Sequence, residues 1–452
     1  MRKFSLIFPV PIALVLLVII FILLKNSVPT FAAYQIAPVT GQDQAFIVVK
    51  FAPGENIVRP ISFTAPISGY AALRLTSLEV ITHEYAWGFA ICSIGGVGCP
   101  ESDCFCYPNK FWNYKYWDGQ AWKGYVVGPS ESTLLDGAMD GWQWGEFTDP
   151  DPLPAPLVQS AASALQWLQL KQSLTNGGYT NDSGSAEALL AVAANNHNAI
   201  DWRLQANSPS LHDYWAGHGA RYSAKGAAEA GKLVVGLAAS DTCWPALAMR
   251  PTQYYSPTSG AYDPETGFHA WGMLGSLALD QPVDTAAIQY LKSMIRPDGG
   301  WEWNSGFGSD SNTTSLAIQA LIGAGEPLTT TEIVSGFVFL KSAQNSDGGF
   351  TYQPGSPYGT DSDANSTAYA VQVIYAANQD PMGVAWTVGS ANPLAYLLSL
   401  QLPNGSFPYQ AGGNENLYAT TQAVPALLGR AFPLKVNNLP PCPAVYVPFT
   451  RN

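Results

Sequence analysis

Apolar helical runs alternate with one recurring short turn along the last third of the chain. Each turn contains Asp or Asn, then one or two small residues, then an aromatic residue: Trp301, Phe350 or Phe407. The apolar runs before the turns are Ala286–Met294, Ile333–Leu340 and Leu394–Leu400, and those after them are Thr314–Ala324, Thr367–Ala377 and Thr420–Leu428. Equivalent positions in successive units (Asn312, Asn365 and Tyr418) are 53 residues apart. The pattern therefore predicts a structural repeat of about 50 residues.

The chemistry of the repeat predicts a pair of helices. Gly in the turn supplies a positive φ, and the aromatic residue returns the chain to the core. The second run opens with Asn, Ser or Thr, which are good helix N-caps. It carries almost no charge, so we expect it to be buried on most sides. Weaker copies upstream, at Asn176–Tyr179, Gly226–Ala239 and Gly260–Tyr262, bring the inner-helix candidates to six. Six pairs in closed order predict an α6/α6 toroid.

These turns resemble the repeats of the terpenoid cyclase and protein prenyltransferase toroids. The resemblance covers about Leu157–Pro433 and implies a ring of inner helices wrapped by outer ones. It is specific for the fold and implies little about any one activity.

The region before the toroid predicts a small β-domain. Gln44–Phe51, Val58–Phe63 and Ala71–Ile81 have the pattern of strands. Asp118-Gly119, between two aromatic-rich runs, predicts a hairpin.

This domain resembles the β-grasp-like domain of the transcobalamin and intrinsic-factor family. The resemblance rests on Ile94–Val97, Phe111–Tyr116, Asp118-Gly119 and Asp136–Trp144. That family pairs the same two modules and holds cobalamin between them, but its toroid comes first. The resemblance implies a corrinoid as a candidate ligand here.

The fold class is therefore α+β and multidomain, with a toroid behind a β-grasp-like domain. The expected divisions are a signal peptide or membrane anchor (1–33), the β-domain (34–147), a Pro-rich spacer (148–156), the toroid (157–433) and a Pro-rich tail (434–452).

The leader and the composition predict an exported protein. Arg2 and Lys3 precede an apolar run over Leu6–Leu24, which suits either a cleaved signal peptide or an uncleaved anchor that would make the membrane a partner. The positive end stays inside in both cases, so we expect the rest to be extracytoplasmic. A net charge of −12 argues against nucleic acid as a partner.

Four of the six cysteines are close together in the sequence: Cys92, Cys99, Cys104 and Cys106. In an exported chain we expect two disulfides from them, with the pairing left open. A zinc site of four thiolates is the alternative, although the spacing lacks two CxxC knuckles. Cys243 and Cys442 are a further candidate pair.

The chemistry of known toroid enzymes is incomplete in this chain. The DxDDTA acid motif of class II terpene cyclases corresponds to Asp363-Ala364-Asn365-Ser366-Thr367-Ala368, in which the second and third acids are replaced. An amide and a hydroxyl are not strong general acids. The zinc ligand set of the prenyltransferases is also absent, so we expect a protein that is more a binder than an enzyme.

The inner-helix starts and the turns supply the candidate ligand-binding residues, which would lie at one end of the ring. They are Asp310, Asn312, Asp363, Asn365, His269, Trp271, Trp303, Tyr352, Tyr409 and Tyr418. The alternative for the Asp and Asn residues is helix capping, and for the aromatic residues it is core packing. His212 and His218 suggest either metal ligands or a polar loop that caps a helix.

The leading functional prediction is an exported protein that holds a small organic ligand between the toroid and the β-domain. Cobalamin is the named candidate, and no cofactor is certain. The alternatives are an isoprenoid- or glycan-active enzyme on the toroid and a structural surface protein.

Overall fold

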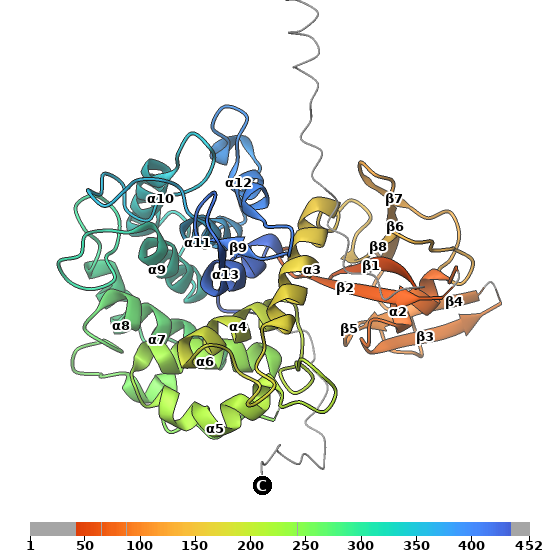
Figure 1. Cartoon of the computed structure of the whole chain (residues 1–452), viewed down its shortest axis with the longest axis horizontal. Coiled ribbons are helices and arrows are strands. Elements are labelled where there is room, and N and C mark those ends of the chain that lie inside the picture. The colour runs from red at the N-terminus through yellow and green to blue at the C-terminus, as the bar shows by residue number, and fades with distance from the viewer. Residues whose placement is uncertain (1–41, 65, 87, 242, 435–452) are drawn as a thin grey trace, which may run out of the picture. The chain divides into compact units, whose positions relative to one another are not determined.

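The computed structural model describes residues 42–434 except 65, 87 and 242. Figure 1 shows an N-terminal β-domain followed by a helical toroid, so the chain is α+β. No helix among the described residues is long and apolar enough to span a bilayer. The expected leader, almost all of the tail and Cys442 lie outside these residues.

One sheet of five strands forms the centre of the β-domain. Its order is β2-β1-β8-β6-β7. The strands are β1 (Asp43–Lys50), β2 (Asn56–Phe63), β6 (Phe111–Trp117), β7 (Trp122–Gly124) and β8 (Met139–Gly145). β1 and β8 are parallel and the other neighbours are antiparallel. The predicted Asp118-Gly119 hairpin is present, since β6 and β7 pair around it.

One strand prediction was wrong. Residues Gly69–Arg74 form the helix α2, which Ser68 begins by accepting a hydrogen bond from Ala71 N. Ala72 and Leu73 are fully buried in the core of the β-domain. The apolar side chains of this segment therefore pack on the sheet as a helix, and strand structure resumes only at Val80.

A second sheet of three strands carries the disulfides. It consists of β3 (Val80–Tyr85), β4 (Gly88–Ile94) and β5 (Val97–Gly98). Cys92 is bonded to Cys104 and Cys99 to Cys106, which confirms the expectation of two bridges. Cys243 is also disulfide-bonded.

The Pro-rich segment after the β-domain is held in place by side chains. Lys50 Nζ donates to the carbonyls of Pro150 and Asp151, at 2.7 and 3.1 Å. Trp122 Nε1 donates to Leu153 O at 3.1 Å. The segment is thus attached to the sheet over much of its length.

The toroid is a closed ring of inner helices. They are α4 (Asp182–Ala194), α6 (Ala227–Ser240), α7 (Thr266–Ala278), α9 (Ser311–Gly323), α11 (Ala364–Ala376) and α13 (Leu417–Leu427). Each packs against the next, and α13 packs against α4. The closest approach is between α6 and α7, where a Cβ on Gly275 would lie 2.6 Å from Gly231 Cα.

Outer helices precede five of the six inner ones. They are α3 (Ala155–Leu170), α5 (Leu211–Ser223), α8 (Thr285–Ser293), α10 (Thr331–Ala343) and α12 (Pro393–Leu400). The position before α7 is filled by the short 3-10 helix η1 (Pro251–Tyr254), which packs on α6 and α7. The described ring therefore departs from six equal pairs at this place. η2 (Val384–Trp386) and the short strands β9 (Phe407–Pro408) and β10 (Glu415–Asn416) lie in connecting segments.

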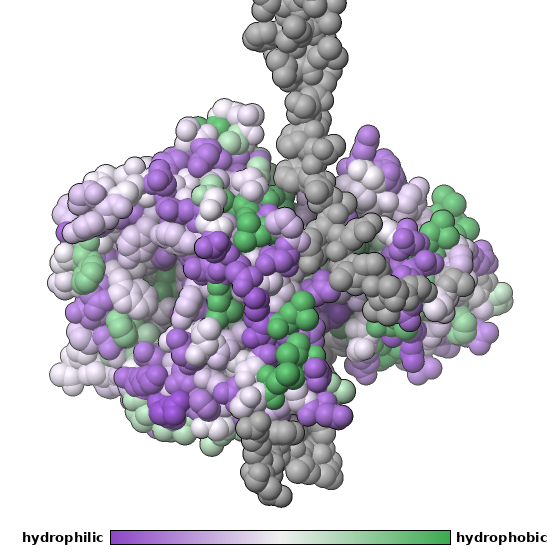
Figure 2. Space-filling model, viewed as in Figure 1, coloured by the Kyte–Doolittle hydropathy of each residue, from purple (hydrophilic) through white to green (hydrophobic). Residues whose placement is uncertain are grey.

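The visible face of the toroid is mostly hydrophilic or intermediate, with scattered apolar areas (Figure 2). The apolar side chains of the inner helices are instead buried between the two layers.

Candidate functional site

A hydrogen bond from each aromatic turn to its inner helix is repeated around the ring. Thr314, Thr367 and Thr420 accept from the backbone N–H of Trp301, Phe350 and Phe407, at 2.9, 2.9 and 2.8 Å. Ser185 does the same for Tyr179 at 2.9 Å. These side chains fix the turns and therefore point outward from the ring axis.

His269 takes the place of this threonine in α7 and accepts the equivalent hydrogen bond. Its Nδ1 accepts from Tyr262 N at 3.1 Å, and its Nε2 lies 3.0 Å from Ala287 O. Burial lowers the pKa of His269 to about 4. Both nitrogens are engaged in the core, so the prediction that His269 binds a ligand was wrong.

The inner-helix N-termini are capped within the protein. Asp310 Oδ1 accepts from Thr313 N at 2.8 Å, and Asp363 Oδ1 accepts from Ser366 N at 2.7 Å. Burial raises the pKa of each carboxyl to about 6. The two aspartates are therefore helix caps, as the alternative explanation held.

The turn of each repeat also caps the preceding inner helix. Trp303, Tyr352 and Tyr409 use their carbonyls to accept from an N–H in the first turn of α7, α9 and α11, at 3.3, 2.8 and 2.9 Å. These N–H groups are consequently not free for a ligand. The bonds do hold all three aromatic residues at the N-terminal end of the ring, here called the mouth, together with Asn312, Asn365 and Tyr418 of the first helical turns.

Helical periodicity identifies the side chains that face the axis. A residue two positions after the outward-pointing Thr, Ser or His is rotated by about 200° and therefore points inward. These residues, with Lys232 of α6, form what we call the axial layer: Glu187, Lys232, Trp271, Leu316, Tyr369 and Gln422. Trp271 is the only predicted site residue among them.

The contacts of these side chains agree with this assignment. Lys232 Nζ lies 2.6 Å from Glu187 Oε1 and 5.0 Å from the centre of the Trp271 ring. Burial and then the charge of Glu187 raise the pKa of Tyr369. Glu187 and Tyr369 belong to α4 and α11, which are separated in the ring by α13, so the charge of Glu187 acts on a residue of a helix that is not its neighbour.

Amide side chains extend the polar surface around this layer. Asn365 Nδ2 donates to Gln422 Oε1 at 2.5 Å, and Gln372 Nε2 donates to Gln422 O at 3.5 Å. Gln372 is only 1% exposed, yet its Oε1 has no hydrogen-bond partner among the described residues. A buried acceptor without a donor costs roughly 1–3 kcal/mol. This atom is one turn below the axial layer, on the same face of α11.

The C-terminal segment of the toroid lies across the other end of the axis. Phe432 N donates to Gln319 Oε1 at 2.8 Å, and the Phe432 ring is 5.3 Å from that of Trp271. Pro433 lies against Gly323, at 3.3 Å from the position of a Cβ there. Phe432 therefore packs below Trp271, and the polar axial groups face the mouth.

The β-domain contacts the C-terminal ends of the inner helices. Val58 N donates to Asn195 Oδ1 at 2.8 Å, and Asn195 Nδ2 donates back to Val58 O at 2.9 Å. Arg59 donates to the carbonyls of Asn195 and Asn196, at 2.9 and 3.0 Å. Arg430 Nε donates to Ala194 O at 2.9 Å. Positive charge at a helix C-terminus is favourable, and burial lowers the pKa of both arginines to about 10.

This contact does not coincide with the expected ligand site. An inner helix of 13 residues is about 20 Å long, and the predicted residues of α9, α11 and α13 lie at the opposite end. The mouth, and not the contact with β2, therefore brings the predicted residues together.

The two histidines near residue 215 lie on helix α5, where a loop was expected. His212 is paired with Asp241, and His218 Nδ1 lies 2.7 Å from Asp182 Oδ1. The partners differ, and no group of three or more metal-ligating side chains occurs in the described part of the chain. Asp213 forms a capping box with Ser210, which agrees with the capping explanation.

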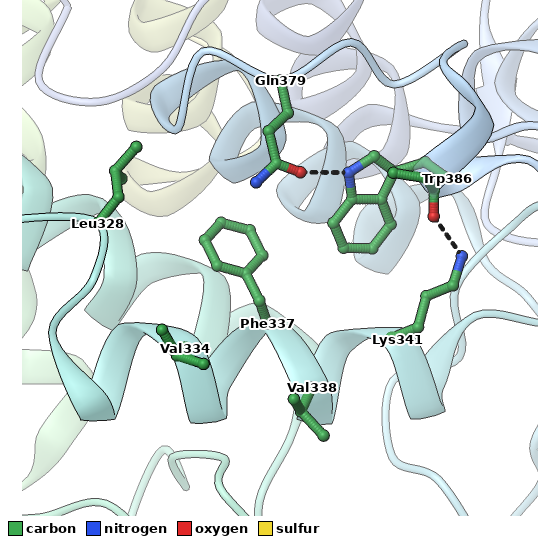
Figure 3. Close-up of a pocket in the computed structure, with 8 residues that line it drawn as sticks. Leu328, Val334, Phe337, Val338, Lys341, Gln379 and Trp386 are labelled. Atoms are coloured by element: carbon green, nitrogen blue, oxygen red, sulfur yellow. Dashed lines mark hydrogen bonds between the residues drawn. The ribbon is translucent and has the colours of Figure 1, made fainter.

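A separate apolar pocket of about 420 Å³ lies on the outer layer. It is lined by α10 and the segment 379–386, and Figure 3 shows Phe337 and Trp386 facing the space between them. Trp386 Nε1 donates to Gln379 Oε1 at 2.7 Å. None of the predicted site residues lines this pocket.

Sequence reasoning missed Glu187, Lys232, Tyr369, Gln372 and Gln422. One signal was available for the ion pair: α7, α9, α11 and α13 contain no charged residue, so a Glu and a Lys inside α4 and α6 stand out. The amides gave no comparable signal.

Comparison with known proteins supports the toroid. Residues 267–415 match the family model described as "Prenyltransferase alpha-alpha toroid domain". This confirms the predicted resemblance for that segment. No curated protein matches the sequence.

Solved structures that are similar to the chain share little sequence with it. The apo type II terpene cyclase MstE from Scytonema is 14% identical, with 61% of this chain and 98% of that one covered and a TM-score of 0.42. The ent-copalyl diphosphate synthase from Streptomyces platensis is 16% identical, with coverages of 55% and 50% and a TM-score of 0.37. Haptocorrin in complex with Cbi is 12% identical, with coverages of 64% and 71% and a TM-score of 0.40. Similarity at this level assigns neither an activity nor a ligand.

Proposed function

We propose that this chain is an exported protein that binds a small organic molecule noncovalently at the mouth of its toroid, above the axial layer. The observation that carries the proposal is that successive repeats place the exposed rings of Tyr352, Tyr409 and Tyr418 and the bonded amides of Asn365 and Gln422 at the same end of the ring.

The axial layer below the mouth supports the same function. Ligand sites combine aromatic surface with a few convergent polar groups. Here Trp271 and Tyr369 supply the aromatic surface, and Lys232 and Gln422 supply polar groups that are partly exposed. The two disulfides of the β-domain suit an oxidising compartment, in agreement with export.

Binding without turnover is part of the proposal. Asn365 and Ser366 stand where the cyclase motif has acids, and both are already bonded, to Gln422 and Asp363. Asp363 itself is engaged in capping α11. An isoprenoid cyclase remains the alternative at the same place, because the pKa of Asp363 is raised to about 6 and a protonated carboxyl is the acid such a reaction needs.

A ligand-independent experiment tests the proposal. The full chain, purified from the organism that encodes it with its disulfides intact, is analysed by native mass spectrometry before and after unfolding. We expect the wild type and Tyr375→Phe to carry a noncovalently bound small molecule. A smaller fraction of Gln422→Ala should carry the same molecule. Tyr375 lies on α11 two turns below Tyr369, so it controls for changes in the same helix.

Two outcomes would contradict the proposal. One is a wild-type protein that carries no ligand and whose midpoint of thermal unfolding is not raised by cyanocobalamin, geranylgeraniol or defined oligosaccharides. The other is a ligand that Gln422→Ala retains in full. Conversion of geranylgeraniol to a cyclic product would instead support the enzyme.

A further inference from the structure

The charged groups of the axial layer neutralise one another. Glu187 and Lys232 are 2.6 Å apart, with 5% and 19% of their side chains exposed. The other four inner helices contribute no charged side chain to the axis. The axial layer therefore offers no unpaired charge to an ionic ligand, and the nearby carboxyls of Asp310 and Asp363 are buried and bonded within their helix caps. The site favours a neutral molecule.

The amides around the mouth offer both donors and acceptors. The bond between Asn365 and Gln422 uses the amino group of the first and the carbonyl of the second. The carbonyl of Asn365 therefore remains as an acceptor, and the amino group of Gln422 remains as a donor. Hydroxyl groups match such a mixture because each one donates and accepts.

Aromatic side chains of successive repeats surround these amides at the mouth. Tyr352, Tyr409 and Tyr418 are 41%, 45% and 36% exposed. The first two are held in place by carbonyl bonds to Ser311 N and Ala364 N. A rigid aromatic ring with a hydroxyl provides contact area at low entropic cost. The C–H faces of pyranose rings pack well on such surfaces.

We infer that the molecule bound at the mouth is a short neutral carbohydrate. Its ring faces pack on Tyr352, Tyr409 and Tyr418, and its hydroxyls bond to Asn365 and Gln422. This inference rests on the proposed function and narrows its ligand to one chemical class.

The test is a glycan array of neutral hexose and N-acetylhexosamine oligosaccharides, probed with the oxidised full chain, followed by calorimetric titration of the strongest hit. We expect Gln422→Ala and Tyr409→Ala each to weaken binding at least tenfold. Tyr369→Phe, which removes one hydroxyl and keeps the ring, should weaken it several-fold without unfolding. The control Gln289→Ala changes an exposed amide on α8 and should leave binding unchanged.

The outcomes separate this inference from the proposed function. If cyanocobalamin or geranylgeraniol binds and no oligosaccharide does, the assignment of the ligand as a carbohydrate is wrong, and the proposed ligand site stands. Oligosaccharide binding that is unaffected by Gln422→Ala, Tyr409→Ala and Tyr369→Phe overturns the inference as well. If no probe binds and native mass spectrometry finds no ligand, both fail.

Discussion

The ion pair between Lys232 and Glu187 gives the sharpest test of the axial layer. Lys232→Met removes the charge and keeps a side chain of similar length. The carboxylate of Glu187, whose side chain is 5% exposed, then loses the cation at 2.6 Å. The contact of the ammonium with the Trp271 ring, at 5.0 Å, is lost as well. We expect the single variant to be clearly less stable than the wild type.

The size of the effect follows from this burial. Breaking a buried pair by removing one partner typically costs about 3–5 kcal/mol of unfolding free energy, because an uncompensated charge stays buried. Glu187→Gln should cost less, roughly 1–2 kcal/mol, because Lys232 is 19% exposed and can be hydrated from the mouth. The double variant leaves neither charge, so it should be more stable than Lys232→Met alone.

The assay is urea unfolding of the oxidised full chain, followed by tryptophan fluorescence and far-ultraviolet circular dichroism. Coincidence of the two probes checks that a single transition is being compared. Lys292 of the outer helix α8 provides a control, since its ammonium lies 3.0 Å from Glu326 and 3.9 Å from Glu332, and its side chain is 17% exposed. Lys292→Met should cost only about 1 kcal/mol.

Two results would refute the reasoning. If Lys232→Met costs less than Lys292→Met, Glu187 is not enclosed as the ring requires. If the double variant is as unstable as Lys232→Met, the cost comes from lost packing and not from an unpaired charge.

Three further predictions concern the framework. Thr367→Val leaves a buried turn N–H without an acceptor and should lower the unfolding free energy by about 1–3 kcal/mol. The control Thr360→Val, at an exposed site, should change the unfolding free energy little. Equal urea midpoints for the two variants would contradict this prediction. The folded pKa of Asp363 is raised from 3.8 to about 6, so its contribution to stability is full below pH 3.8 and is lost as the pH rises through about 6. Asp363→Asn keeps the cap and should remove this loss, which reaches about 3 kcal/mol and falls mainly between about pH 3.8 and about pH 6; an unchanged slope of stability against pH would count against it. Arg59→Met removes two charge-assisted hydrogen bonds, so it should lower the unfolding free energy by about 2–4 kcal/mol and speed hydrogen exchange in β2. The control Arg74→Met, at an exposed site, should do neither. Slow exchange in both variants would show that the contact does not depend on Arg59.

The sequence by itself determined the repeat. Turn glycines, cap residues and the aromatic residue after each turn act within about twenty positions of one another, so their spacing could be read directly. The same holds for the hairpin at Asp118-Gly119 and for the two disulfides, though not for their pairing. Local physics decides these features.

Where local preference was weak, the surroundings decided. The segment Gly69–Arg74 has apolar residues that suit either a strand or a helix, and it became α2 because Ala72 and Leu73 pack on the sheet. His269 fits a ligand site as well as a core position, and only the buried turn of Tyr262 shows that it replaces a threonine.

Only the tertiary structure decided which groups meet at the axis and which end of the ring the β-domain covers. Lys232 and Glu187 are 45 residues apart, and Val58 and Asn195 are 137 apart. The pattern of apolar residues in a helix predicts which of its faces turns inward. Closure of the ring determines which side chains of the other helices that face meets. Such long-range pairings depend on the packing of whole helices, so no local spacing encodes them.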